Sequence, residues 1–116
     1  MAYTQEMELL ATLARPFCIL DTKSLGQFKE LLGLFVEYNT HTNLSAIREP
    51  EAIVVKHFAD SLALLSFESI EGLSILDIGT GGGFPGIPLV LACSGVSVTL
   101  LDSTVKKVRA CTHFAQ

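Results

Sequence analysis

The fold of this chain is decided by the segment Asp77-Ile78-Gly79-Thr80-Gly81-Gly82-Gly83-Phe84-Pro85-Gly86. It follows a short apolar run at residues 74–78 and precedes an apolar segment at residues 87–93. Glycines at such a junction permit positive φ in a tight turn, and they let a ligand approach the backbone where a Cβ would collide. Pro85 and Pro88 suit the first turn of a helix, where backbone N–H groups have no intrahelical partner. The pattern predicts a strand, a ligand-binding glycine loop and a helix.

A second strand, with β-branched residues, is predicted at residues 96–101, and a second helix at residues 104–115. Strand, loop, helix, strand and helix in this order form a βαβα unit with parallel strands. Asp102 ends the second strand about 20 residues beyond the glycines, where a carboxylate can accept hydrogen bonds from both hydroxyls of a ribose. Ligands of open α/β sheets bind at the carboxyl ends of the strands, so Asp102 and the glycine loop are predicted to share one site.

The pattern changes near residue 72, and residues 1–72 are predicted to form a helical subdomain in front of the βαβα part, residues 73–116. Ser24 and Gln27 form an S-x-x-Q capping box, which is predicted to open a helix. Pro50 suits the first position of the next helix. The buried face of that helix is predicted to carry Ile53, Val54, His57, Phe58, Ser61, Leu62 and Leu65.

Composition indicates a folded domain, because 49% of the residues are hydrophobic and only 17% are charged. No apolar run reaches the ~18 to 20 residues that span a membrane, and the first residues do not resemble a signal peptide, so a cytoplasmic protein without a membrane partner is predicted. The three cysteines form no C-x-x-C pair, which predicts neither a metal site nor a disulfide framework. The net charge of -4 argues against a stand-alone nucleic-acid-binding module.

Two interpretations of the glycine loop differ in the ligand. Residues 81–86 satisfy G-x-G-x-x-G, the fingerprint of a dinucleotide site, which would suit an NAD(P)-dependent oxidoreductase. Residues 77–83 satisfy D-x-G-x-G-x-G, which resembles motif I of S-adenosylmethionine-dependent methyltransferases. The second interpretation is favoured because it explains Asp77 and places the first two glycines at the end of the strand. A fragment that keeps the fold without catalysis is a third hypothesis.

Four segments together resemble the family of ribosomal RNA small subunit methyltransferase G, also called glucose-inhibited division protein B. They are residues 39–48 (NTHTNLSAIR), 56–62 (KHFADSL), 77–89 (DIGTGGGFPGIPL) and 101–109 (LDSTVKKVR). The resemblance runs from about residue 24 to the end of the chain, and the GFPGIP motif is more specific than the glycine loop itself.

This resemblance implies a Rossmann-like class I methyltransferase fold of the α/β class, present here as an incomplete parallel sheet behind the helical subdomain. It implies S-adenosylmethionine as the cofactor and 16S rRNA or the small ribosomal subunit as the partner, with N7 of guanine 527 as the methyl acceptor. Family members are much longer than 116 residues, so an inactive fragment is expected. Catalytic residues stay unassigned. The expected cofactor-binding residues are Asp77, Gly79, Gly81, Gly83, Phe84, Asp102, Ser103 and Thr104.

The sequence leaves several roles open. His57 is either a core or capping histidine or a contact near the cofactor. Asn39 and Asn43 either close their loop with hydrogen bonds or contact the RNA or the cofactor. Asp77 either binds the backbone of the glycine loop or lies near the cofactor's amino group. The basic cluster of Lys106, Lys107 and Arg109 either contacts phosphate or is a solvated helix face.

Overall fold

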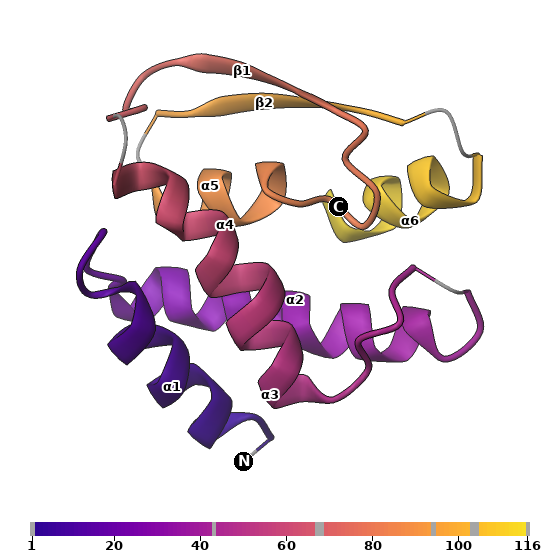
Figure 1. The fold of residues 1–116 in the computed structure, drawn as a ribbon, viewed down its shortest axis with the longest axis horizontal. Coiled ribbons are helices and arrows are strands. Elements are labelled where there is room, and N and C mark those ends of the chain that lie inside the picture. Colours follow the sequence, from indigo (N-terminus) through magenta and orange to yellow (C-terminus); the bar gives the residue numbers. More distant parts are fainter. Residues whose placement is uncertain (1, 43, 67–68, 94, 103–104, 116) are drawn as a thin grey trace.

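The computed structural model describes residues 2–42, 44–66, 69–93, 95–102 and 105–115. Three layers are visible in Figure 1: a small sheet, a pair of helices beneath it, and the N-terminal helices beneath those. Among the described residues, no helix combines the length and the hydropathy that are needed to cross a membrane.

The first two helices are α1 (Thr4–Ala14) and α2 (Thr22–Asn39), and the start of α2 corrects the predicted capping box. The N-cap is Asp21, whose side chain accepts a hydrogen bond of 2.7 Å from the Ser24 amide. Asp is as good an N-cap as Ser, so the helix begins one turn earlier than the S-x-x-Q pattern indicates. Ser24 instead donates its hydroxyl to the Leu91 carbonyl at 3.0 Å and ties α2 to the βαβα part.

One continuous helical run covers residues 50–66 but changes its winding along the way. It consists of α3 (Pro50–Ile53), the π-helix η1 (Val54–Ala59), α4 (Asp60–Leu62) and the 3-10 turn η2 (Ala63–Ser66). Pro50 at the first helical position is confirmed. The predicted face is buried at Ile53, Val54, Phe58, Ser61 and Leu62, while His57 and Leu65 are half-buried.

A single hydrophobic core connects the N-terminal helices to the βαβα part. Its largest fully buried side chains include three phenylalanines, Phe28, Phe35 and Phe58. From the C-terminal part, Leu89 and Phe114 join the same cluster. The glycine loop and the helical run 50–66 are thereby held against each other, which matters for the site described below.

The sheet has two parallel strands, β1 (Ser74–Ile78) and β2 (Ser97–Leu101), in register from Ser74 opposite Ser97 to Ile78 opposite Leu101. The helix α5 (Gly86–Ala92) connects them, and α6 (Val105–Ala115) follows. The predicted βαβα order and the parallel pairing are therefore confirmed.

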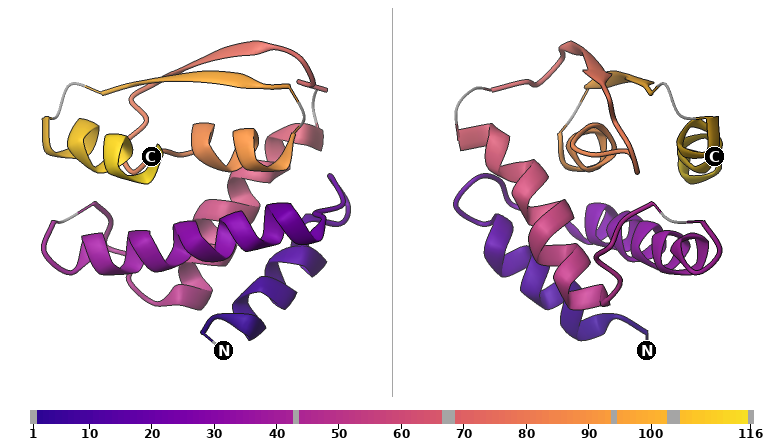
Figure 2. Two further views of the ribbon diagram at one scale, coloured as in Figure 1. Left: turned by 180° about the vertical axis from the view of Figure 1, so that it is seen from behind. Right: turned by 45° about the vertical axis from the view of Figure 1, so that its right-hand side comes forward.

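Both helices lie on the same face of the sheet, as the two views in Figure 2 show, and among the described residues no helix covers the other face. The side chains that point to this outer face are exposed: Ile78 by 75%, Leu76 by 53% and Leu101 by 47%. Parallel sheets normally have both faces covered, so two strands covered on one face are an incomplete α/β sheet, as predicted.

Candidate functional site

The glycine loop leaves β1 at the point where β2 ends. The amides of Gly79 and Thr80 both donate to the Leu101 carbonyl, at 2.8 and 3.0 Å, and so extend the strand pairing into the loop. Asp102 follows directly, and its Oδ2 accepts a hydrogen bond of 2.9 Å from the Gly81 amide. The structure therefore brings Asp102 and the glycine loop together at the carboxyl ends of the strands.

The three glycines of the D-x-G-x-G-x-G motif do not serve the same purpose. All have positive φ: 73° at Gly79, 60° at Gly81 and 101° at Gly83. Apart from the chain neighbours, no atom of the described residues lies within 4 Å of where a Cβ would be at Gly79 or Gly81, so these two positions border open space. A Cβ at Gly83 would collide with the Ile87 side chain. Gly79 and Gly81 thus leave room for a ligand, whereas Gly83 permits packing of the loop on α5.

The Asp77 carboxylate braces the glycine loop from inside. Its Oδ2 accepts hydrogen bonds from the Thr80 hydroxyl at 2.7 Å and from the Gly86 amide at 3.0 Å, and the residue is only 9% exposed. Of the two roles left open for Asp77, the structure therefore shows the bond to the loop backbone. A contact with the cofactor stays a prediction.

Cys111 on α6 contacts the same loop, and sequence reasoning missed it. Its Sγ donates a hydrogen bond of 3.3 Å to the Gly81 carbonyl. Burial, with smaller effects from Asp102 and Asp77, raises the pKa of Cys111 to about 11, so the thiol keeps its proton. Together, Asp102 and Cys111 hold the amide and the carbonyl of one loop residue. A lone cysteine 30 residues away carries no sequence signal for this contact.

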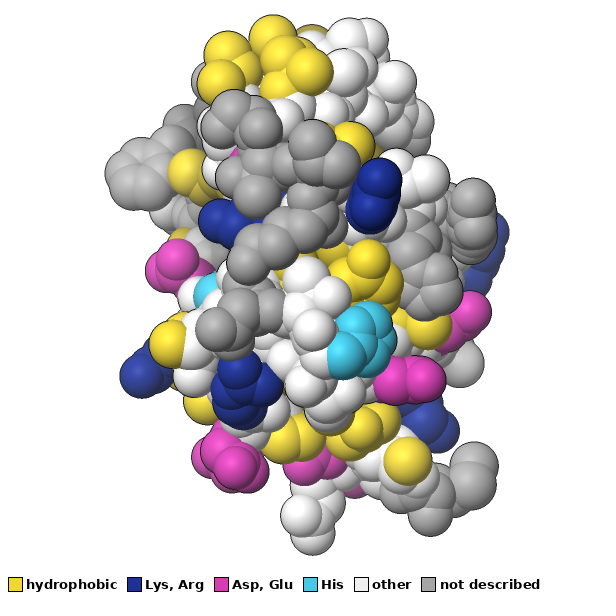
Figure 3. All heavy atoms as spheres, turned by 90° about the vertical axis from the view of Figure 1, so that its right-hand side faces the viewer, with side chains coloured by type: hydrophobic (Ala, Val, Ile, Leu, Met, Phe, Trp, Pro, Cys, Tyr) yellow, Lys and Arg dark blue, Asp and Glu magenta, His cyan; other side chains and the backbone are white. Residues whose placement is uncertain are grey.

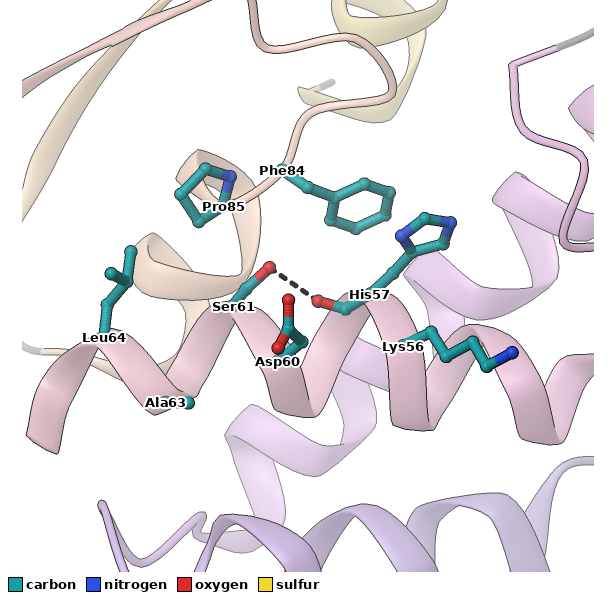
Figure 4. Close-up of a pocket in the computed structure, with 8 residues that line it drawn as sticks. All are labelled: Lys56, His57, Asp60, Ser61, Ala63, Leu64, Phe84 and Pro85. Atoms are coloured by element: carbon teal, nitrogen blue, oxygen red, sulfur yellow. Dashed lines mark hydrogen bonds between the residues drawn. The ribbon is translucent and has the colours of Figure 1, made fainter.

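Phe84 packs into a cluster of rings behind the loop. Its ring is nearly parallel to that of His57, with an interplanar angle of 4° and a distance of 4.6 Å between the ring centroids. The centroids of the Phe35 and Phe58 rings lie 5.4 and 5.9 Å from that of Phe84. Figure 4 shows the Phe84 and His57 rings next to each other above the helical run. Phe84 is half-buried, so its predicted contact with the cofactor is open to test.

His57 is held in place from a second direction. Its Nε2 lies 3.0 Å from the hydroxyl of Ser45, which in turn accepts a hydrogen bond from the Ile47 amide. Burial lowers the pKa of His57 below its ordinary value of 6.5, and the carboxylate of Asp60 opposes that effect. His57 therefore joins the loop 44–47 to the ring of Phe84.

Asn39 closes that loop, which is one of the two roles that the sequence left open. It is 2% exposed, its Oδ1 accepts from the Leu44 and Ser45 amides, and its Nδ2 donates to the carbonyls of Ser45 and Ile47. Asn43, which shares that prediction, lies outside the described residues.

Two of the predicted cofactor residues, Ser103 and Thr104, also lie outside the described part of the chain. In the basic cluster, Lys107 is half-buried and Arg109 is exposed. Lys and Arg side chains are scattered over the face drawn in Figure 3, among acidic and hydrophobic ones, and do not gather into one patch. This distribution gives no preference between a phosphate contact and a solvated surface.

Comparison with known proteins identifies relatives of this chain. The family model for rRNA small subunit methyltransferase G matches residues 24–114. The ribosomal RNA small subunit methyltransferase G of Desulfitobacterium hafniense is 42% identical over 106 residues, which cover 90% of this chain and 44% of the relative. The protein of the same name from Streptococcus pyogenes is 39% identical over 107 residues, 90% of this chain and 45% of the relative. The chain thus spans less than half the length of these relatives.

Proposed function

This chain belongs to the rRNA small subunit methyltransferase G family, and from that premise we propose that it forms the cofactor-binding N-terminal part of an S-adenosylmethionine-dependent methyltransferase. The proposed methyl acceptor is N7 of guanine 527 in bacterial 16S rRNA, presented by the small ribosomal subunit. A ribosomal substrate in turn favours a cytoplasmic location. Membership of a methyltransferase family supports this proposal over the NAD(P)-dependent oxidoreductase that residues 81–86 left open.

The observation that carries the proposal is the open space in front of the glycine loop, next to Asp102. Gly79 and Gly81 hold backbone conformations with positive φ, and beyond their chain neighbours no described residue comes within 4 Å of the place where a Cβ would be. The Asp102 carboxylate lies beside them and binds the Gly81 amide. A bare backbone surface beside an acceptor for ribose hydroxyls fits a nucleoside cofactor.

The proposed chemistry asks little of the protein beyond positioning. S-adenosylmethionine supplies an electrophilic methyl group, and guanine N7 already has a free lone pair, so no general base is needed at the acceptor. The residues of the site then have to hold the cofactor and the base in line, which by itself accounts for a large part of the rate of such reactions. Asp77, Thr80 and Cys111 contribute by holding the loop rigid.

Cofactor binding is tested by calorimetry with S-adenosylmethionine, S-adenosylhomocysteine and NAD on the chain co-expressed with a C-terminal part from a relative, because the 116-residue chain alone is expected to bind the donor weakly or not at all. We expect the first two to bind and NAD not to bind. Gly79→Val fills the open space and should abolish binding. Asp102→Ala should weaken it by about 1.5–3 kcal/mol, because hydrogen bonds to a charged group are lost. Normal binding by both variants, each folded, would show that the site is misplaced.

We further propose that the 116-residue chain transfers no methyl group by itself. The exposed outer face of β1 and β2 supports this, because the sheet lacks the layer that covers it in α/β proteins. The test incubates small ribosomal subunits with labelled methyl donor and either the chain alone or the chain co-expressed with the residues that follow the matched part in the Desulfitobacterium hafniense relative. We expect transfer only with both parts, and robust transfer by the chain alone would overturn this proposal.

A further inference from the structure

A second recess adjoins the glycine loop and shares only Phe84 with the predicted cofactor contacts. It is a cleft of about 400 Å³ between the helical run 50–66 and the end of the loop, within the range of roughly 300–1,000 Å³ that small-molecule sites occupy. Figure 4 shows the residues that line it, which are Lys56, His57, Asp60, Ser61, Ala63, Leu64, Phe84 and Pro85.

The polar side of the cleft comes from the π-helix and the residue after it. The π-helix η1 (Val54–Ala59) contains Lys56 and His57, and Asp60 follows it directly. π-Helical turns are rare, less favourable than α-helical ones and frequent at functional sites. At the end of this segment Ala59 is buried in the core, and Asp60 is exposed.

The two walls of the cleft differ in chemistry. One wall is formed by Phe84 and Pro85, and the Phe84 ring is held in place by its stack on His57. The other carries the Asp60 carboxylate, which Figure 4 shows below Phe84, while Lys56 extends along the helix away from that ring. Phe84 and Pro85 beside the Asp60 carboxylate suit a planar base that presents N–H donors at its edge.

We propose that this cleft receives the acceptor base and that Asp60 selects guanine by accepting hydrogen bonds from its N1–H and its 2-amino group. Adenine has no N1–H, and its N1 is an acceptor that would face the carboxylate unfavourably. Both donors lie on the edge of guanine opposite N7, so a base held by Asp60 leaves N7 free. Methylation gives the base a positive charge, which a nearby carboxylate also stabilises. This inference rests on the proposed function.

The test uses the 116-residue chain, which contains every residue of the cleft. The isotope-labelled chain is titrated with GMP, IMP and AMP, and binding is followed by NMR shifts of Ser61, Phe84 and their neighbours. We expect GMP to bind roughly tenfold tighter than AMP, because GMP can donate two hydrogen bonds to Asp60 but water competes for them at this exposed carboxylate. IMP, which lacks the 2-amino group, should lie between them. The three ligands carry the same phosphate, so its contribution cancels.

Asp60→Asn keeps the shape of the side chain and should reduce the preference for GMP over AMP to less than threefold. Because Asp60 is exposed, the variant is expected to fold. The matched control is Glu51→Gln, which removes an exposed carboxylate from the same helical run outside the cleft and should keep the preference. Equal binding of GMP and AMP by the unmodified chain, or an unchanged preference in Asp60→Asn, would overturn the inference.

Cofactor titration of the chain co-expressed with the second part distinguishes this inference from the proposed function. Titration with S-adenosylhomocysteine reports on Gly79, Gly81 and Asp102, whereas the nucleotides report on Asp60 and Ser61, which are not predicted cofactor contacts. Cofactor binding without a guanine preference rejects the role of Asp60 and leaves the proposed function standing. A guanine preference without any cofactor binding, with the co-expressed second part present, rejects the cofactor site and supports the cleft as a base site.

Discussion

Among the individual residues of the site, those that face the open space differ from those that hold the loop. Gly79 and Gly81 border free volume, while Asp77, Asp102 and Cys111 make hydrogen bonds that fix the loop backbone. Two titratable groups in this region, His57 and Cys111, have shifted pKa values and give measurable consequences.

Replacing His57 should change how stability depends on pH. Its pKa is lowered in the folded state by burial, so the unfolded chain binds the proton more readily below the ordinary value of 6.5. The neutral His57 should therefore make its full contribution to the free energy of unfolding above pH 6.5. That contribution should fall as the pH drops below 6.5. Melting temperatures at pH 7.5 and 5.5 should differ more for the unmodified chain than for His57→Gln. The exposed His41, replaced in the same way, is the control and should leave the difference unchanged.

Cys111 should resist alkylation in the folded chain. With a pKa of about 11, roughly one thiol in 1,000 is ionised at pH 8, and the thiolate is the reactive form. Iodoacetamide labelling, followed by peptide mass mapping, should modify Cys111 far more slowly than after unfolding in urea. Asp102→Asn removes a charge that raises this pKa but keeps an acceptor for the Gly81 amide, and should speed the reaction. Equal rates in the folded and unfolded chain would contradict the contact with Gly81.

At the scale of elements, the junction between β1 and α5 depends on one buried carboxylate. Asp77 lies in β1 and its Oδ2 accepts a hydrogen bond from the amide of Gly86, the first residue of α5. A Cβ at Gly86 would lie 2.5 Å from Leu100 Cδ2 and 2.9 Å from Asp77 Oδ2, so the helix approaches the strands as closely as a glycine allows. The strand, the loop and the helix are therefore locked as one unit.

Thr80→Val should weaken this unit. Its hydroxyl donates a hydrogen bond of 2.7 Å to the Asp77 carboxylate, and both residues are buried. Valine has the same shape without the donor, so we expect the free energy of unfolding to fall by about 1.5–3 kcal/mol, as for a lost hydrogen bond to a charged group. Urea titration measures it. Thr99→Val on the exposed face of β2 is the matched control and should stay within about 0.5 kcal/mol of the unmodified chain.

For the whole molecule, the dominant feature is the uncovered face of the sheet. The core is continuous from α1 to α6 on one side of the sheet, while Leu76, Ile78 and Leu101 face outward on the other. A recess of about 420 Å³ adjoins this face and is lined mainly by apolar side chains, among them Leu64, Ile70 and Leu89. An exposed apolar strand surface of this kind promotes association between copies.

Ile78→Thr should reduce self-association without loss of stability. The side chain is 75% exposed, so its removal costs little buried surface, and the free energy of unfolding should change by less than about 0.5 kcal/mol. Light scattering should show less aggregate, and the fluorescence of a dye that binds apolar surface should fall. The same replacement at the fully buried Ile53 should cost on the order of 2 kcal/mol or more. Unchanged scattering in Ile78→Thr would show that this face is not responsible.

The sequence by itself determined the βαβα order, the parallel strands and the position of Asp102 beside the glycine loop. These features depend on local patterns, since glycines, prolines and apolar runs act on their immediate neighbours, and parallel strands bring their carboxyl ends to one edge. The first capping residue of α2 was predicted wrongly because Ser24 and Asp21 both fit a cap, and only the packing of α2 against α5 gives Ser24 its bond to Leu91.

Only the tertiary structure decided which groups meet across long stretches of chain. The contact of Cys111 with Gly81 joins residues 30 apart, and the stack of His57 on Phe84 joins two separate segments. The π-helical winding of η1 also has no signature in the hydrophobic periodicity, which assumes an α-helical turn throughout, and the cleft between Asp60 and Phe84 joins two separate segments. Such contacts depend on how whole elements pack, because the free energy of burying Phe35, Phe58 and their neighbours outweighs local winding preferences.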